Sequence, residues 1–153
     1  MQSMKFVVIA TPDECHLIAK EHRHFPVIIT GVGAINVIKA LSGISRDAEI
    51  INYGYAGSTN LVIGETYKVG EVCLYHPNVT YCEPHMECDS HCAITCYTSC
   101  DFVLKSEITK SCVFDMELAY IVAMGFKKVT AYKTVSDNLN YEQYETSRQR
   151  KSC

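Results

Sequence analysis

Carboxyl side chains directly follow two apolar segments of this chain, and they are the groups best suited to chemistry. Asp115 and Glu117 come just after Phe114, and Asp137 comes just after Val135-Ser136. Carboxylates accept hydrogen bonds, and a carboxyl whose pKa is raised by burial can donate a proton near neutral pH. Taken singly, each also has a structural interpretation as a helix cap or as a favourable charge near the start of a helix.

Glycine-rich turns and a cluster of cysteines are the other candidates. Backbone amides of Gly31-Val32-Gly33 could hold an anion at a helix start, although a lone Gly-x-Gly is more often only a turn. Cysteines recur every fourth residue from Cys88 to Cys100, with histidines nearby, which is compatible with zinc. Three of them would lie about 13 Å apart end to end on a strand, so we favour small buried residues with reduced thiols and no metal.

The elements that must position these groups alternate between strands and helices. Apolar or β-branched runs predict strands, helical spacing predicts helices, and mixed composition at 77–91 predicts a loop. The expected strands are 5–10, 26–30, 49–53, 69–75, 93–97 and 128–135, and the expected helices are 13–23, 34–44, 115–124 and 141–150. This order predicts an α/β fold, a three-layer α/β/α sandwich with a mixed, mostly parallel central sheet. Ligands gather at the carboxyl ends of such strands, where the glycine turns and the carboxyl groups fall.

Composition restricts the class of protein. The chain has 153 residues, 48% of them hydrophobic, and 14 basic against 17 acidic residues, so its formal charge is −3. An acidic chain without a basic cluster gives no electrostatic reason to expect nucleic acid or an anionic membrane as partner. No apolar run reaches the roughly 18 residues needed to span a bilayer. We expect a soluble cytoplasmic protein whose nine cysteines are reduced.

Taken in order, short segments of the chain resemble the signature segments of the nucleoside phosphorylase and nucleosidase superfamily. The segments are Thr30-Gly31-Val32-Gly33, Asn52-Tyr53-Gly54-Tyr55-Ala56-Gly57, Val69-Gly70-Glu71-Val72, Thr98-Ser99-Cys100-Asp101-Phe102, Phe114-Asp115-Met116-Glu117 and Val135-Ser136-Asp137. They are most similar to the methylthioadenosine and S-adenosylhomocysteine nucleosidases. Each segment is weak alone, but six in the right order, between about residues 5 and 140, predict a single nucleoside phosphorylase-like domain over residues 1–153.

The resemblance implies a role for each site residue. It places Glu117 at the ribose hydroxyls with Met116 packed on the sugar, Phe102 against the base, and Asp137 as the acid that protonates the leaving purine. Asp115, Tyr55 and Gly33 belong to the same substrate-binding set. Breaking an N-glycosidic bond passes through a ribosyl cation-like state, which a nearby carboxylate stabilises.

Three departures from the family pattern affect the mechanism. Hydrolytic relatives activate water with a Glu at the position where this chain has Cys15. If the alignment is shifted by one residue, Glu14 takes that position instead. Tyr55 stands where relatives have a small Ser, and no Arg precedes this turn as it does in phosphorolytic relatives. The segment between Val72 and Ala93 and the last helix are also shorter than in most relatives.

The leading hypothesis is therefore hydrolysis of purine nucleosides or of methylthioadenosine- or S-adenosylhomocysteine-like substrates, without a cofactor. A purine nucleoside phosphorylase with phosphate as co-substrate and a catalytically inactive nucleoside-binding protein stay open. The resemblance also implies a homodimer or higher homo-oligomer.

Overall fold

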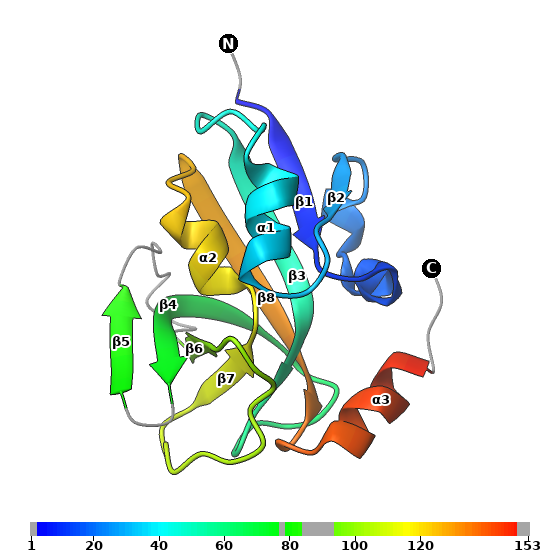
Figure 1. Ribbon diagram of the computed structural model, residues 1–153. Coiled ribbons are helices and arrows are strands. Elements are labelled where there is room, and N and C mark those ends of the chain that lie inside the picture. The colour runs from blue at the N-terminus through cyan, green and yellow to red at the C-terminus, as the bar shows by residue number, and fades with distance from the viewer. Residues whose placement is uncertain (1–2, 77–78, 84–93, 150–153) are drawn as a thin grey trace.

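The computed structural model describes residues 3–76, 79–83 and 94–149, and strands dominate this part of the chain (Figure 1). The strands are β1 (Lys5–Ile9), β2 (Val27–Ile29), β3 (Glu49–Gly57), β4 (Thr66–His76), β5 (Val79–Glu83), β6 (Ile94–Thr98), β7 (Cys112–Asp115) and β8 (Lys128–Asp137). The α-helices are α1 (Ala34–Leu41), α2 (Leu118–Ala123) and α3 (Tyr141–Gln149), and two 3-10 helices are η1 (Pro12–Leu17) and η2 (Lys20–His22).

All eight strands join one mixed sheet. β2, β1, β3 and β8 are parallel neighbours in that order, and β4–β6 and β6–β7 are also parallel. β3–β7, β4–β5 and β4–β8 are antiparallel. The α/β class and the mixed, mostly parallel sheet are confirmed.

The sheet differs from the flat centre of a sandwich because five of its strands close on themselves. β3 pairs with β8, β8 with β4, β4 with β6, β6 with β7, and β7 returns to β3. Register shifts at Ala56/Gly57 and at Val69/Glu71 bend the long strands β3 and β4. Such irregularities increase local twist, which allows the ends of a sheet to meet.

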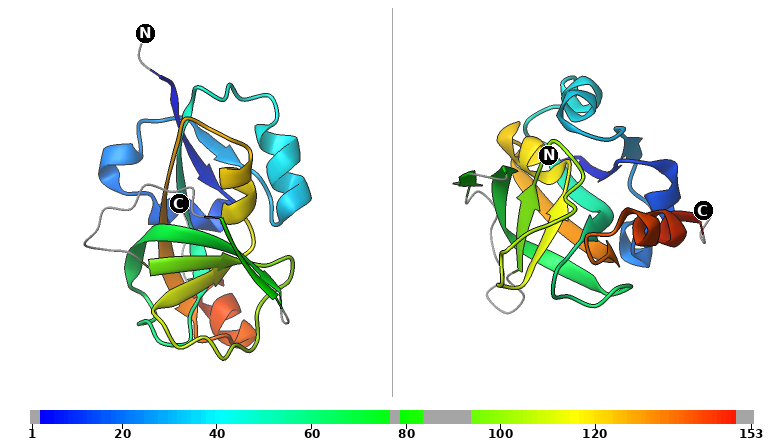
Figure 2. Two further views of the ribbon diagram at one scale, coloured as in Figure 1. Left: turned by 90° about the vertical axis from the view of Figure 1, so that its left-hand side faces the viewer. Right: turned by 60° about the horizontal axis from the view of Figure 1, so that its bottom comes forward.

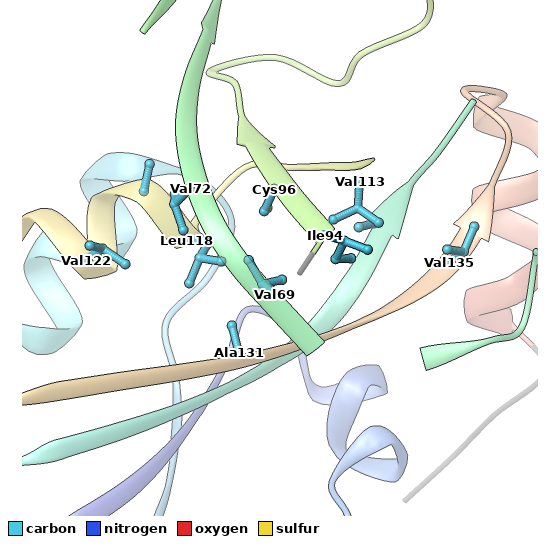
Figure 3. Packing of buried hydrophobic residues seen from close by; sticks show 11 residues of the cluster. Val69, Val72, Ile94, Cys96, Val113, Leu118, Val122, Ala131 and Val135 are labelled. Atoms are coloured by element: carbon cyan, nitrogen blue, oxygen red, sulfur yellow. The ribbon is translucent and has the colours of Figure 1, made fainter. Parts of the chain in front are cut away.

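Four apolar clusters hold the described helices and strands together, and two of them join the helices α1 and α2 to the sheet. One draws on all five strands of the closed ring and on α2, and Figure 3 shows Val69, Val72, Ile94, Leu118 and Ala131 converging within it. The other lies between the β1–β3 region and the helices α1 and α2, which lie side by side (Figures 1 and 2). Because β1, β3 and β8 are parallel neighbours, their carboxyl ends share one edge of the sheet that these clusters support.

Several predicted elements have different bounds. The helix expected at 13–23 was wrong, because η1 and η2 are separate 3-10 turns there. Both oxygens of Glu14 are bound by backbone N–H groups, which fixes that segment in a tight turn. The helix expected from residue 115 begins at Leu118, after the unpredicted strand β7, and β5 occupies part of the predicted loop.

The described helices are all too short or too polar to cross a membrane.

Candidate active site

A cavity lies where the ends of β1, β3, β7 and β8 meet η1 and α3. The hollow with its open mouth measures about 420 Å³, and the space that can hold the centres of water-sized molecules about 50 Å³. The lining residues are Ala10, Thr11, Glu14, Val32, Tyr55, Ala56, Gly57, Phe102, Phe114, Asp115, Met116, Glu117, Ser136, Asp137 and Tyr144. Segments far apart in the sequence thus place four carboxyl groups around one space.

Glu14 is buried at the start of η1 and is held by three backbone donors. Its Oε1 accepts hydrogen bonds from the N–H groups of Ala10 (2.8 Å) and Thr11 (3.1 Å), and its Oε2 accepts one from Tyr55 (2.7 Å). Burial raises the pKa of Glu14, opposed by the charge of Lys133 and by these three donors. A carboxylate offers about four acceptor positions, so one remains for a ligand or a water molecule.

Asp115 forms a buried ion pair with Lys133, a residue that the sequence analysis missed. The Nζ of Lys133 lies 3.0 Å from Oδ2 of Asp115, and both side chains are 1% exposed or less. Asp115 also accepts hydrogen bonds from the Thr98 hydroxyl and from the Leu118 N–H, where α2 begins. Burial would raise the pKa of Asp115, but Lys133 and these donors hold it below its usual value.

Glu117 accepts fewer hydrogen bonds from the described residues than the other three carboxyl groups of the cavity do. Its Oε2 accepts one hydrogen bond, from the N–H of Gly33 at 2.9 Å. Burial and the negative charge of Asp115 raise the pKa of Glu117 to about 8, although Lys133 opposes the shift. The contact joins the start of α1 to the start of α2, so it brings together two segments 84 residues apart.

Asp137 lies at the end of β8 and is completely buried. The Ser136 hydroxyl donates to its Oδ1 at 2.6 Å, and the Asn140 N–H donates to its Oδ2 at 3.2 Å. Burial raises the pKa of Asp137 despite these hydrogen bonds. Gly57 packs against it so closely that a Cβ there would lie 2.9 Å from Oδ2 of Asp137. The glycine is thus required by the position of the carboxyl group.

Aromatic rings form part of the cavity wall. The ring centroids of Phe102 and Tyr144 lie 5.3 Å apart, and Tyr141 lies 5.4 Å from Phe102. Arg148 attaches α3 to η1 through Asp13, with Nε 3.0 Å from Oδ2, and the right-hand view of Figure 2 shows the two elements together. This ion pair connects the aromatic wall to the turn that carries Glu14.

The structure brings the remaining predicted site residues to the same place. Met116 and Tyr55 line the cavity, and Gly33 reaches it through its bond to Glu117. The hydroxyl of Tyr55 lies 2.8 Å from Nε2 of His16, so the phenol is fixed in the wall. Cys15, by contrast, packs in the apolar cluster around Ile18. Glu14, one residue earlier, is the side chain that faces the cavity.

Lys133 could have been noticed in the sequence. It interrupts an otherwise uncharged run from Val129 to Val135, four residues before Asp137. A charged residue in the middle of a predicted buried strand is rarely tolerated without a partner. Which carboxyl group would pair with it depends on the folding of β7 beside β3, which local patterns do not give.

The predicted cysteine and histidine cluster falls mostly on residues 84–93, outside the described residues. Of its described members, Cys96 is buried in the ring core and Cys100 is exposed. Among the residues that the structure describes, no three His, Cys, Asp or Glu side chains are arranged so that they could hold a metal ion.

Comparison with known proteins gives a clear result for the fold. No protein-family model matches the chain, and no curated protein matches its sequence. A variant of MTAN from Chlamydia trachomatis bound to MTA superimposes with a TM-score of 0.75 and 17% identity, covering 97% of this chain and 91% of that one. The S-adenosylhomocysteine nucleosidase of Streptococcus pyogenes has a TM-score of 0.72 at 16% identity, and the match covers 99% of this chain and 92% of that one. The futalosine hydrolase of Helicobacter pylori has a TM-score of 0.72 at 12% identity, and the match covers 97% of this chain and 92% of that one.

These matches extend over nearly the whole chain. The chain therefore has the fold of the methylthioadenosine and S-adenosylhomocysteine nucleosidases, as its ordered segments predicted.

Proposed function

We propose that this chain is a nucleosidase, which hydrolyses the N-glycosidic bond of purine nucleosides or of methylthioadenosine- or S-adenosylhomocysteine-like substrates. In this proposal residues 1–153 form one nucleoside phosphorylase-like domain. The observation that carries the proposal is that Glu14, Glu117 and Asp137 line one cavity. Two solved structures of the same fold hold MTA and adenine.

Asp137 supplies the proton for the leaving base in this mechanism. A purine leaves poorly as an anion, so a ring nitrogen must be protonated as the bond breaks. Burial raises the pKa of Asp137, which favours the protonated form that a general acid requires. The hydrogen bond from Ser136 fixes Oδ1 at 2.6 Å, and Oδ2 is the oxygen that packs against Gly57.

Glu117 binds the sugar. Its carboxylate accepts hydrogen bonds from ribose hydroxyls and stabilises the positive charge that develops on the ring. Met116 packs against the sugar, and Phe102 contacts the base from the wall of the cavity.

Glu14 orients and activates the attacking water. Its three backbone donors lock the side chain in one orientation, which is what a positioned base needs. Burial raises the pKa of Glu14 against the effect of these donors, so the carboxylate can accept a proton from the water that it holds in line with the sugar carbon.

Phosphorolysis has less support than hydrolysis. None of the described residues that line the cavity is Lys or Arg. Two of the three backbone amides in the glycine turn are already engaged, since the N–H of Gly31 bonds to Ala10 and that of Gly33 to Glu117. A phosphate ion in the cavity would also lie among four carboxyl groups.

The hollow measures about 420 Å³ with its open mouth, of which about 50 Å³ can hold the centres of water-sized molecules. A bound nucleoside would therefore fill the mouth as well as the interior, where Phe102 and Tyr144 form part of the wall. These two rings belong to the segments of the wall that are outside the sheet.

The proposal is tested by incubating the protein with adenosine, inosine and 5′-methylthioadenosine, with and without phosphate, and separating free base by liquid chromatography. We expect base release at equal rates in both buffers, lost in Asp137→Asn and strongly reduced in Glu14→Gln. The exposed Glu107→Gln is the matched control and should retain the rate. Binding without any release of base would instead support the non-catalytic alternative, and release only with phosphate would support a phosphorylase.

We also propose a homodimer formed through the outer face of α1. Ile35 and Ile38 are 74% and 52% exposed, and Val32, which is 42% exposed, joins this face to the cavity. Exposed aliphatic side chains gathered on one face are typical of an association surface. Light scattering should give a dimer for the wild type and a monomer for Ile35→Glu; a wild-type monomer at micromolar concentration would reject this face as an interface.

A further inference from the structure

Three carboxyl groups share one ammonium group beneath the cavity. Glu14, Asp115 and Glu117 are all buried, and Lys133 is the cation whose charge acts on each of them. Lys133 lies in direct contact with Asp115, at 3.0 Å. The cluster therefore has an excess of negative charge if every carboxyl group is ionised, and charges buried in this way strongly repel one another.

Hydrogen-bond donors are distributed unequally among the three groups. Asp115 is bound by Lys133, the Thr98 hydroxyl and the Leu118 N–H, and Glu14 is bound by three backbone N–H groups. Glu117 is bound by the N–H of Gly33. Donors stabilise an ionised carboxyl group, so Glu117 is the group on which a proton is held most easily.

The other titratable groups around Glu117 do not remove this excess. Those that act on it or share its cavity are Glu14 from η1, Tyr55 from β3, Asp115 from β7, Tyr120 from α2, Lys133 and Asp137 from β8, and Tyr144 from α3. Burial raises the pKa of Tyr55 and of Tyr144 to about 12 and that of Tyr120 further, so the three phenols are neutral at physiological pH. Burial and the charge of Asp115 raise the pKa of Glu117 to about 8.

We infer that Glu117 is protonated in the empty site and releases its proton when the hydroxyl groups of a ribose bind, so that nucleoside binding is coupled to proton release. The inference rests on the proposed nucleosidase function. Two ribose hydroxyls donate two hydrogen bonds, which an ionised carboxylate accepts and a neutral carboxylic acid accepts less well. The proton passes from the Glu117 carboxyl group to a buffer base, and no other bond changes.

This coupling predicts how affinity depends on pH. Below the pKa that Glu117 has in the empty site, its proton must be removed before the ribose binds. The dissociation constant should therefore fall about tenfold for each unit that the pH rises, and it should level off above about pH 8. Affinity for a ligand without ribose should lack this dependence.

Titration calorimetry at pH 7 in buffers of different ionisation enthalpy measures the proton directly. The probe is a C-nucleoside analogue of adenosine, whose carbon–carbon linkage resists hydrolysis, and free adenine reports protons that move at Asp137 when the base binds. We expect the analogue to release about one more proton per site than adenine does. The difference should vanish in Glu117→Gln and persist in the exposed Glu107→Gln.

The outcomes separate the two proposals. Analogue binding with the same proton count as adenine would overturn the coupling and leave the nucleosidase proposal intact. Failure of the analogue and of every tested nucleoside to bind would overturn both.

Discussion

Removing the ammonium group of Lys133 should be one of the most destabilising single changes in this chain. The side chains of Lys133 and Asp115 are 1% and 0% exposed, with 3.0 Å between Nζ and Oδ2. Lys133→Met deletes the cation and leaves a buried carboxylate without its counter-ion. Breaking one partner of such a pair typically costs about 3–5 kcal/mol, a large share of the roughly 5–15 kcal/mol that stabilises a domain.

The loss should depend on pH in a defined direction. In the wild type, Lys133 and the donors of Asp115 hold the pKa of that carboxyl group below its usual value. Its contribution is therefore present at neutral pH and is lost as pH falls through the folded-state pKa. In Lys133→Met, burial without a cation raises the pKa of Asp115, so the variant loses stability as pH rises. The difference between the two proteins should be larger at pH 7 than at pH 4.5.

Urea unfolding followed by circular dichroism measures these free energies, and a double variant identifies their origin. Asp115→Asn combined with Lys133→Met removes both charges. The amide keeps an oxygen to accept from the Leu118 N–H, and its NH2 group can donate to the Thr98 hydroxyl, so the double variant should be clearly more stable than Lys133→Met alone. The exposed pair of Lys5 and Glu49, at 3.4 Å, gives the control, since Lys5→Met should cost less than about 1 kcal/mol. A cost below about 1 kcal/mol for Lys133→Met, or strictly additive effects in the double variant, would refute the buried-pair interpretation.

Three further changes test individual parts of the site. Because the pKa of Glu117 is raised from 4.5 to about 8, its contribution to stability is present below about pH 4.5 and is lost as pH rises through 8. Glu117→Gln should therefore gain roughly 4–5 kcal/mol over wild type at pH 9 and about 1 kcal/mol or less at pH 5 in thermal unfolding. An equal gain at both pH values would contradict the raised pKa. Gly57→Ala places a Cβ 2.9 Å from Oδ2 of Asp137 and 3.0 Å from Leu139. We expect kcat for base release to fall at least about tenfold while circular dichroism shows that the fold persists. An unchanged kcat would show that Asp137 is not held where the reaction occurs. Arg148→Gln breaks a partly exposed ion pair with Asp13, so it should lower the free energy of unfolding by less than about 1 kcal/mol. A larger loss in a urea titration would mean that the packing of α3 contributes to the stability of the whole domain.

Much of the fold follows from local patterns. Apolar runs located β1, β2 and the first part of β3, and helical spacing located α1 closely. The carboxyl groups of Glu117 and Asp137 do lie at strand ends around one cavity, as expected. Parallel pairing explains only part of this, because β8 is parallel to β3 whereas β7 is antiparallel to it. The two strand ends meet because Gly57 at the end of β3 pairs with Phe114 on one side and with Asp137 on the other.

Tertiary contacts decided the rest. The segment after Pro12 has helical character, yet the backbone bonds to Glu14 hold it as a 3-10 turn against β3. Closure of five strands depends on register shifts near Gly57 and Val69, which no periodicity reveals. Lys133 is a polar residue by type, and only its neighbour Asp115 explains its burial.

Isotope labelling of the product tests the proposed reaction most directly. The protein is incubated with 5′-methylthioadenosine in water enriched in ¹⁸O and free of phosphate, and the released sugar is analysed at once by mass spectrometry. Hydrolysis within the cavity of Glu14, Glu117 and Asp137 predicts free adenine together with methylthioribose carrying one ¹⁸O atom, and neither product with Asp137→Asn. Intact nucleoside after prolonged incubation with folded, ligand-binding protein would contradict the assignment.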